Sequence, residues 1–365
     1  MKNIAIVIDS LSGGGAEKVM LTLSAALIGL GHCVTLLSLS GKQDYSIPEG
    51  LNLEILFPEK RSSPDRFWRI NSSVKKLQDW FVERQQALGK FDLILSNLDK
   101  SNNLLAKSNI KNAFYIVHNS VEQELQRQNK LGPVSYNYLK KSKQNLSGNN
   151  IVCVSKGLKQ EILDGSIIRP ASIRTIYNPF DRQRIVEQSN IANEGIPSTP
   201  YLIHVGRFAK QKRHDVLFEA FEQLDPRYEL VLLCNKPEKA RKLARKFGIE
   251  DRLVLPGFQM NPYNWIKNAE ALILTSDYEG LSMVLLEALA VGTKVVSTRC
   301  PHGPSEILTG ELSRFLVPVQ DPRSLAAAIN EVLRADIDCI NTNILKEVEA
   351  ENVARQYLSL IDTPN

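Results

Sequence analysis

The sequence lacks any long apolar run. None approaches the roughly 18 residues that mark a membrane-spanning helix, and the apolar stretch at residues 4–8 ends at Asp9. So short a run, closed by a charged residue, also does not fit a secretory signal peptide. We therefore expect neither a membrane span nor a signal peptide, and a protein that stays in the cytoplasm.

Cysteine is scarce as well. The five cysteines are widely separated and include no Cys-x-x-Cys pair, which disfavours both a disulfide framework and a zinc site. Most lie in apolar, strand-like runs, so we expect reduced core residues. The only Asp-x-Asp, at residues 336–338, follows the last helix expected in the second half of the chain. We interpret it as surface and expect no metal site.

Neither sign of charge dominates. A net charge of +5 over 365 residues is too small to indicate nucleic-acid binding, although it suits an anionic substrate or a membrane surface. A hydrophobic content of 43% and a charged content of 23% are typical of a soluble globular protein. The length favours two domains of roughly 150 to 200 residues each.

The dinucleotide motif G-x-G-x-x-G is also missing. Residues 2–40 nevertheless predict a strand, a glycine-rich turn, a helix and a second strand, which is a βαβ unit. Gly13, Gly14 and Gly15 either let the backbone approach a ligand or simply form a tight turn. Without the motif, a nicotinamide-dependent dehydrogenase is the weakest functional alternative.

Strands and helices alternate along most of the chain. The rhythm is lost at residues 181–200, where Gln, Asn, Gly and Pro gather, and then restarts. We therefore expect an α/β fold with two doubly wound domains, residues 1–181 and 182–345. Facing carboxyl edges of two such sheets leave a cleft, which is the expected binding site.

In the first domain, a helix is predicted over residues 67–88, and a strand over 114–117 ends at His118. A lone histidine at a carboxyl strand edge is either structural or catalytic. Residues 125–147 interleave Lys and Arg with Leu, Val and Tyr and contain no acidic residue. This run is either a solvated helix face or a basic, aromatic surface that contacts a membrane.

Residues 276–292 of the second domain are the most informative stretch. They place Glu279 in a turn after an apolar strand, and Glu287 inside a helix that Ser282 caps and Gly292 ends. A carboxylate in so apolar a helix needs a partner. The pair spans about 12 Å if the helix is regular, comparable to the distance from a sugar across a diphosphate to a ribose. The structural alternative is a turn residue and a core residue paired to an arginine.

Two cations, Arg207 and Lys212, follow the strand predicted at residues 201–205. They fall at the carboxyl edge of the second sheet, where Glu279 also emerges. An arginine can bind phosphate oxygens as a fork and a lysine as a point charge, so the two together suit a diphosphate. Either one alone could equally be a solvated loop residue.

Together these features resemble the retaining glycosyltransferases of family 4, which have the GT-B fold of two Rossmann-like domains. The resemblance covers nearly the whole chain and is densest in the second domain. Its motifs are SGGGAEKV, HVGRFAKQKRHDVLFEAF, DYEGLSMVLLEALAVGTKVVST and CPHGPSEIL, the last containing Glu306.

The resemblance implies a site for a nucleotide sugar, with no further cofactor. Arg207 and Lys212 would bind the diphosphate, and Glu287 the ribose hydroxyls. Glu279 would contact the sugar and phosphates together with the backbone of Gly280, Leu281 and Ser282. Whether Glu279 acts as a nucleophile or as an electrostatic partner is left open by the residues.

The resemblance also assigns roles in the first domain. His118 would lie over the sugar near the anomeric carbon, and Gly14 would approach the phosphates. The C-terminal helix, within residues 346–365, would pack back on this domain. Two departures from the family pattern bear on nucleotide contacts: residues 235–237 replace a glycine-rich turn, and Arg213 stands where relatives have glycine.

We therefore predict metal-independent, retaining transfer of a hexose or N-acetylhexosamine from a UDP-sugar. The expected acceptor is a glycan, lipid-linked or of lipopolysaccharide type, reached at the inner face of the plasma membrane through residues 125–147. A sugar-nucleotide epimerase or phosphorylase of the same fold is the alternative enzyme. It would form product without an acceptor or would depend on phosphate. A catalytically silent nucleotide-sugar-binding protein is the third reading, which slow donor hydrolysis would exclude.

Overall fold

The computed structural model describes residues 1–58, 64–65, 68–340 and 342–362. It divides into two compact units. The N-terminal unit comprises Met1–Phe180 and Glu347–Asn365, and the C-terminal unit comprises Asp181–Lys346.

The N-terminal unit is built on a seven-stranded parallel sheet with the strand order β3-β2-β1-β4-β5-β6-β7. The strands are β1 Asn3–Ile8, β2 Cys33–Ser40, β3 Asn52–Phe57, β4 Leu93–Asn97, β5 Ala113–Val117, β6 Asn150–Cys153 and β7 Ser172–Thr175. The strand order changes direction between β1 and β4. In doubly wound sheets this switch point opens a crevice at the carboxyl ends of the strands.

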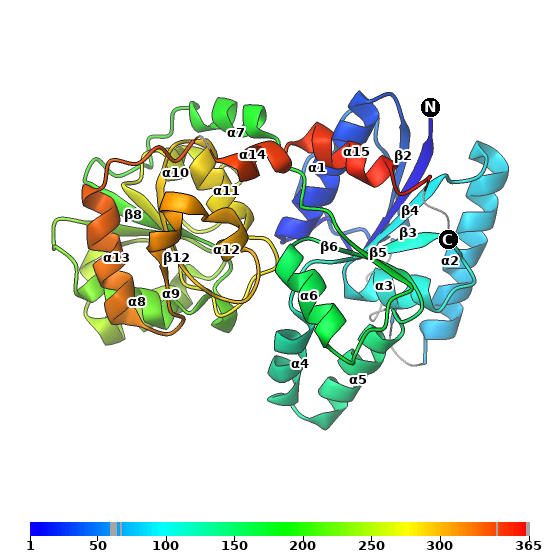
Figure 1. The fold of residues 1–365 in the computed structure, drawn as a ribbon, viewed down its shortest axis with the longest axis horizontal. Helices are drawn as coiled ribbons and strands as arrows, with labels where there is room; N and C mark the ends of the chain where they lie inside the picture. Colours follow the sequence, from blue (N-terminus) through cyan, green and yellow to red (C-terminus); the bar gives the residue numbers. More distant parts are fainter. Residues whose placement is uncertain (59–63, 66–67, 341, 363–365) are drawn as a thin grey trace. The chain divides into compact units, whose positions relative to one another are not determined.

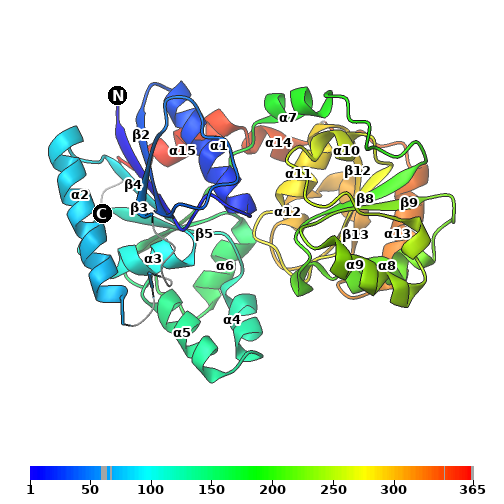
Figure 2. The same cartoon turned by 180° about the vertical axis from the view of Figure 1, so that it is seen from behind.

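Helices lie on both sides of this sheet (Figures 1 and 2). They are α1 Gly15–Gly29, α2 Ile70–Leu88, α3 Asp99–Ala106, α4 Val121–Asn129, α5 Pro133–Gln144, α6 Lys156–Asp164 and α15 Ala350–Leu358. The central strands β1, β4 and β5 are buried almost throughout, as expected for a parallel sheet covered on both faces. Polar side chains that can meet a ligand therefore gather just beyond the strand ends, at Asp9, Asp99 and His118.

The C-terminal unit contains a six-stranded parallel sheet with the order β10-β9-β8-β11-β12-β13. The strands are β8 Tyr201–Val205, β9 Glu229–Leu233, β10 Leu253–Val254, β11 Ala271–Leu274, β12 Lys294–Thr298 and β13 Leu316–Val317. Here the order switches between β8 and β11. The loops that follow these two strands carry Arg207, Lys212 and Glu279, and Glu287 lies in the helix Met283–Ala290 that follows the second loop.

The helices of the C-terminal unit are α7 Arg182–Ser189, α8 His214–Glu222, α9 Pro237–Ala244, α10 Tyr263–Lys267, α11 Met283–Ala290, α12 Pro304–Ile307, α13 Pro322–Arg334 and α14 Asn343–Glu347. Short 3-10 helices occur at Lys210–Lys212, Arg245–Phe247, Glu250–Arg252 and Gly310–Phe315. Helix α13 packs on α8 and on β12, and α7 packs on α10 and α11.

The C-terminal segment belongs to the N-terminal unit. The Phe180 N–H donates to the Val348 carbonyl at 2.8 Å, and the Ala350 N–H donates to the Phe180 carbonyl at 3.1 Å. These bonds anchor the start of α15, which packs against α1 (Figure 1). The chain leaves the N-terminal unit after Phe180 and returns to it before Val348, and backbone hydrogen bonds join these two segments.

The doubly wound α/β architecture predicted for both halves is confirmed. The elements that were not predicted include β3, α3 and α6 in the N-terminal unit, and α7, α12, β13 and α14 later in the chain. Residues 181–200 were expected to be an irregular connection between the domains, but α7 occupies residues 182–189. The helix expected from residue 67 begins at Ile70, and residue 67 itself lies outside the described residues. All five cysteines are free, but Cys33 is exposed rather than in the core.

Candidate active site

The loop after β8 places Lys212 over the switch point of the C-terminal sheet. The Lys212 side chain packs over the backbone of Gly206, where a Cβ would lie 3.4 Å from Lys212 Cε. The Thr275 hydroxyl donates to the Lys212 carbonyl at 2.6 Å, which ties this loop to the end of β11. The Lys212 backbone is therefore held by both central strands.

Lys212 and Glu279 meet directly. Lys212 Nζ lies 2.7 Å from Glu279 Oε1, and the Ser276 hydroxyl donates to the same oxygen. Only 8% of the Glu279 surface is exposed, so the pair is formed in a poorly solvated place. Two further bonds join the same loops: Gln211 donates to the Tyr278 carbonyl at 2.6 Å, and the Asp277 N–H donates to the Gln211 carbonyl at 2.8 Å.

Arg207, unlike Lys212, forms no ion pair with a carboxylate of the described residues. Its side chain is exposed, and among the described residues it makes no hydrogen bond or ion pair. Its guanidinium donors are thus available to a ligand at the same strand end. Lys212 would have to share its charge between such a ligand and Glu279.

Arg213 stands in the turn after Lys212, where relatives have glycine. It adopts the left-handed conformation, with φ 47° and ψ 52°, that glycine would take without strain. Its guanidinium is held by Asp215 at 2.8 Å and by Asp277 at 3.2 Å. These ion pairs offset the backbone strain, so the tight turn after Lys212 forms without a glycine.

The start of α11 forms an anion-binding geometry. Ser282 occupies the N-cap as predicted, but its hydroxyl makes no capping hydrogen bond. That hydroxyl is buried and has no partner among the described residues. Gly303, with φ 65°, packs against this turn, where a Cβ would come within 3.0 Å of the Gly280 carbonyl oxygen and 3.3 Å of the Ser282 nitrogen. Free N–H groups and an unused hydroxyl at a helix start suit a phosphate.

Glu287 lies one turn from the end of α11 and is 8% exposed. The Tyr263 hydroxyl, from the start of α10, lies 3.5 Å from Glu287 Oε1. Tyr263 was missed by sequence reasoning, because nothing in its local pattern relates it to residue 287.

Two buried histidines lie beneath the Lys212 loop and were also missed. The rings of His204 and His214 are 4.9 Å apart, and His204 Nδ1 lies 2.8 Å from the Ile273 carbonyl oxygen. Burial, with the charge of Lys212 adding to it, lowers the pKa of His214 to about 4. Both rings are therefore neutral near pH 7 and support the cationic loop without adding charge.

In the N-terminal unit, β5 delivers His118 to the carboxyl edge of the sheet. His118 Nε2 lies 3.1 Å from Asn97 Oδ1, at the end of β4. Burial lowers the pKa of His118 to about 4, against the opposing charge of Asp99. The imidazole is thus neutral and oriented by the amide of Asn97.

Gly14 faces a carboxylate in this structure. A Cβ at Gly14 would lie 2.2 Å from Glu17 Oε2, so a larger residue there would displace this folded-back side chain. Glu17 is buried in the first turn of α1, where an acid interacts favourably with the helix dipole. The phosphate role of Gly14 stays a prediction.

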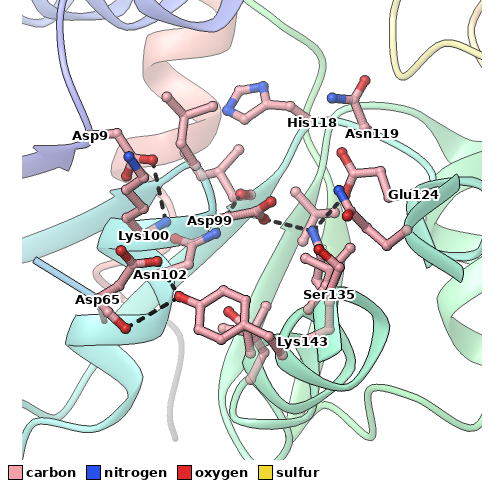
Figure 3. A pocket seen from close by; sticks show the side chains of 18 residues that line it. Asp9, Asp65, Asp99, Lys100, Asn102, His118, Asn119, Glu124, Ser135 and Lys143 are labelled. Atoms are coloured by element: carbon pink, nitrogen blue, oxygen red, sulfur yellow. Dashed lines mark hydrogen bonds and ion pairs between the residues drawn. The ribbon is translucent and has the colours of Figure 1, made fainter. Parts of the chain in front are cut away.

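A cavity of about 450 Å³ opens beside His118, at the switch point of the N-terminal sheet (Figure 3). Asp9 lines it from the end of β1, and its carboxylate accepts hydrogen bonds from the backbone and hydroxyl of Ser101. Burial raises the pKa of Asp9 to about 6, although the Ser101 bonds oppose the rise. Asp9 was not singled out as a site residue in the sequence.

Lys143 corrects the interpretation of residues 125–147 as one solvated or membrane-facing surface. The run forms parts of two helices, and the Lys143 side chain is buried. Its Nζ lies 2.7 Å from Asp99 Oδ1 and 2.8 Å from Glu124 Oε2 (Figure 3). Burial disfavours the ammonium, but the two carboxylates outweigh it and raise the pKa of Lys143.

The nine residues assigned to the site thus fall into two groups. Arg207, Lys212, Glu279, Glu287 and the turn 280–282 lie at the switch point or on α11 of the C-terminal unit, and Gly14 and His118 lie at strand ends of the N-terminal unit. Within the described ranges, no group of three or more His, Cys, Asp or Glu side chains could hold a metal ion. No helix in these ranges is long and apolar enough to cross a bilayer.

Comparison with known proteins adds to this geometry. Residues 13–184 match the family described as Glycosyltransferase Family 4, and residues 186–344 match Glycosyl transferases group 1. One similar curated protein is the N-acetylgalactosamine-N,N'-diacetylbacillosaminyl-diphospho-undecaprenol 4-alpha-N-acetylgalactosaminyltransferase of Campylobacter jejuni. It is 27% identical over 350 residues, which cover 92% of this chain and 91% of that protein.

A second relative is the lipopolysaccharide 1,6-galactosyltransferase of Escherichia coli, 28% identical over 56% of this chain and 58% of that protein. Among solved structures, Anabaena Alr3699/HepE in complex with UDP-glucose superposes with a TM-score of 0.68 at 17% identity. The superposition covers 99% of this chain and 96% of that one. At this identity the structural likeness shows a shared fold.

Proposed function

The chain belongs to the family 4 (group 1) glycosyltransferases of the GT-B fold, and on that premise we propose that it is a retaining transferase that uses a UDP-sugar. The transferred group is a hexose or N-acetylhexosamine. The acceptor is a glycan, lipid-linked or of lipopolysaccharide type. The names of the similar Campylobacter and Escherichia proteins support this class of acceptor.

The donor proposal depends on one observation: cations and hydrogen-bond donors from two loops lie at the switch point of the C-terminal sheet. Arg207 and Lys212 lie in the loop that follows β8. The turn before α11 supplies backbone N–H groups and the Ser282 hydroxyl, which has no partner among the described residues. Such a set offers cations and hydrogen-bond donors to a diphosphate. The UDP-glucose bound to the Anabaena protein of the same fold supports the choice of nucleotide sugar.

The reaction we propose needs no carboxylate base. The bond between the anomeric carbon and the diphosphate oxygen breaks, and the acceptor hydroxyl attacks from the same face. Its proton passes to the departing diphosphate oxygen, so UDP leaves and the configuration is retained. Arg207, Lys212 and the α11 turn would stabilise the charge that develops on the diphosphate.

The remaining residues take supporting roles in this proposal. Glu279 would orient Lys212 and contact the sugar, and Glu287 would bind the ribose hydroxyls. His118, neutral and held by Asn97, would offer a hydrogen bond near the anomeric carbon. Metal independence and a retained configuration stay predictions about the chemistry.

A donor screen tests the proposal directly. UDP release is measured for a panel of UDP-sugars, with and without a lipid or oligosaccharide extract. The proposal expects slow hydrolysis of one UDP-sugar alone and much faster UDP release with extract. Release from no UDP-sugar would contradict it, and rapid product formation without extract would favour the epimerase alternative.

We also propose that residues 127–134, which span the end of α4, the connecting loop and the start of α5, contact an anionic membrane surface. Leu131 is 67% exposed and Val134 is 83% exposed, although both are apolar. Arg127 and Lys130 are exposed in the same segment, and Lys141 is exposed further along α5. Exposed apolar residues with cations near them in the sequence suit the interface of a bilayer that contains anionic lipids.

Co-sedimentation with vesicles tests this surface. Binding to phosphatidylglycerol vesicles should fall as salt rises, because salt screens the cations. Leu131→Asp should weaken binding, whereas Val82→Asp, at an apolar position of α2 that is 55% exposed, should not. Equal binding of both variants, or no binding at low salt, would remove the membrane proposal.

A further inference from the structure

The cavity beside His118 has a chemical character of its own. It lies within the N-terminal unit, between the ends of β1, β4 and β5 and the helices α3, α4 and α5 (Figure 3). Its volume of about 450 Å³ falls within the range of small-molecule sites. Its position at the switch point of the sheet is where doubly wound folds bind ligands.

The charged groups that line the cavity are mostly acidic. Four carboxylates and two ammonium groups face it, so formal negative charge exceeds positive charge by two. These groups are Asp9, Asp65, Asp99, Glu124, Lys100 and Lys143. The one imidazole, His118, is neutral near pH 7 because its pKa is about 4.

The buried cation is not available to an anion. Lys143 already lies between Asp99 and Glu124, at 2.7 and 2.8 Å, and its side chain is 6% exposed. An anionic ligand that displaced Glu124 would leave this largely buried carboxylate without its cation, which is costly. Lys100 is exposed, where water and salt weaken its attraction for an anion.

The cavity also offers what a sugar ring needs. Carboxylates accept hydrogen bonds from hydroxyl groups, and Tyr138 and Leu139 add apolar wall against which C–H groups can pack. Asn102 lines the cavity, is 5% exposed, and donates to the Ile116 carbonyl at 3.1 Å. Its Oδ1 has no partner among the described residues, so one acceptor in the wall is unsatisfied.

We propose that this cavity binds the terminal sugar of the acceptor and that it selects an uncharged sugar over a uronic acid or a phosphorylated sugar. The proposal rests on the proposed glycosyl transfer. Because His118 lines the cavity, a hydroxyl of the bound sugar is presented beside the ring that we place near the anomeric carbon. The acidic wall repels a carboxylate or phosphate on the acceptor sugar, and hydroxyl or acetamido groups avoid that cost.

Saturation-transfer NMR on the full chain, without donor, tests the selection. The probes are the methyl glycosides of glucose, galactose, N-acetylglucosamine and N-acetylgalactosamine, and the methyl glycosides of glucuronic and galacturonic acid. At least one uncharged glycoside should bind, and its matched uronide should bind about tenfold more weakly or not at all. Binding of no uncharged glycoside, or equal binding of the uronides, overturns the proposal.

A matched pair of variants places the binding in the cavity. Ser135→Trp fills the cavity from α5, whereas Asn137→Trp adds the same ring to an exposed position of the same helix outside it. Ser135→Trp should abolish the glycoside signal and Asn137→Trp should keep it. Signal that survives Ser135→Trp overturns the assignment. If Ser135→Trp does not fold, the comparison of uncharged and acidic probes on the wild-type chain still decides.

Failure here and failure of the proposed function are distinguishable. Hydrolysis of a UDP-sugar by the wild-type chain, measured without acceptor, reports on the donor chemistry alone. Hydrolysis without glycoside binding would overturn the cavity assignment and keep the transferase. Glycoside binding without hydrolysis of any UDP-sugar would support a sugar site and contradict the UDP-sugar donor on which transfer depends.

Discussion

Lys212 Nζ lies 2.7 Å from Glu279 Oε1, although the two residues are 67 positions apart in the sequence. The ion pair joins the loops that follow β8 and β11, the two strands at the switch point of the C-terminal sheet. It also keeps a buried carboxylate compensated when no phosphate is bound. Replacing Lys212 would therefore remove a ligand contact and at the same time leave Glu279 without its cation.

Glu287 provides a test of the ribose contact. Glu287→Gln should weaken UDP binding by about 1.5 to 3 kcal/mol, because a charge-assisted hydrogen bond to the ribose is lost. The variant should also lose the preference of the wild type for UDP over 2′-deoxy-UDP. Calorimetric titration measures both. Glu219→Gln, an exposed position of α8, is the control, and an unchanged preference for UDP in Glu287→Gln would contradict the assignment.

His118 should affect turnover rather than donor affinity. We expect His118→Ala to lower the rate of UDP-sugar hydrolysis by about tenfold or more while the Kd for UDP stays nearly constant. The reason is that the ring is proposed to interact near the anomeric carbon and not with the nucleotide. Steady-state kinetics and a UDP titration separate the two effects. A loss of UDP affinity with unchanged kcat would show that the proposed role is wrong.

His214 should make stability depend on pH. Its folded pKa of about 4 lies below the unfolded value of 6.5, so the unfolded chain binds a proton first as pH falls. This contribution is fully present above pH 6.5 and is lost as pH falls towards 4, amounting to about 2 kcal/mol by about pH 5. The free energy of unfolding of the wild type and of His214→Asn is measured with urea at a series of pH values. The two free energies should change with pH in parallel above about pH 7, and below it the free energy of the variant should fall less steeply. Equal slopes between about pH 7 and 5 would speak against it.

Lys143 should be a major stabilising residue of the N-terminal unit. Lys143→Ala leaves Asp99 and Glu124 without their shared cation, and we expect it to lower the free energy of unfolding by about 3 to 5 kcal/mol. Lys141→Ala, on the exposed face of the same helix, should change it by less than about 0.5 kcal/mol. Denaturant unfolding measures both. A loss of less than about 1 kcal/mol for Lys143→Ala would mean that the ion pairs contribute little.

The sequence predicted the alternation of strands and helices well because buried parallel strands are continuously apolar. It missed β3, an edge strand whose residues are mostly half-exposed and include Glu54. It missed α3 because that helix is short and polar, with Ser101, Asn102 and Asn103 buried. Ser101 donates to Asp9, Asn102 lines the cavity, and Asn103 accepts a hydrogen bond from Asn145. Hydrophobic periodicity could not reveal such polar contacts.

The candidate site was predictable to the extent that it depends on strand ends. Arg207, Lys212 and Glu279 follow β8 and β11, and neighbouring strand ends in a parallel sheet bring their loops together. Pairings between distant side chains were not predictable. The burial of Lys143 between residues of α3 and α4, and the folding of Glu17 over Gly14, depend on how the helices pack.

Titration with UDP tests the central claim most directly, and Arg207 is the cleanest residue to change. Its side chain is exposed and makes no hydrogen bond or ion pair with the described residues, so Arg207→Ala disturbs no internal contact. Calorimetry should show UDP binding to the wild type. Arg207→Ala should weaken it by about 1.5 to 3 kcal/mol, and Lys210→Ala, an exposed cation of the same loop, by less than about 0.5 kcal/mol. Binding of UDP to Arg207→Ala as tight as to the wild type would contradict a diphosphate site at the carboxyl end of β8.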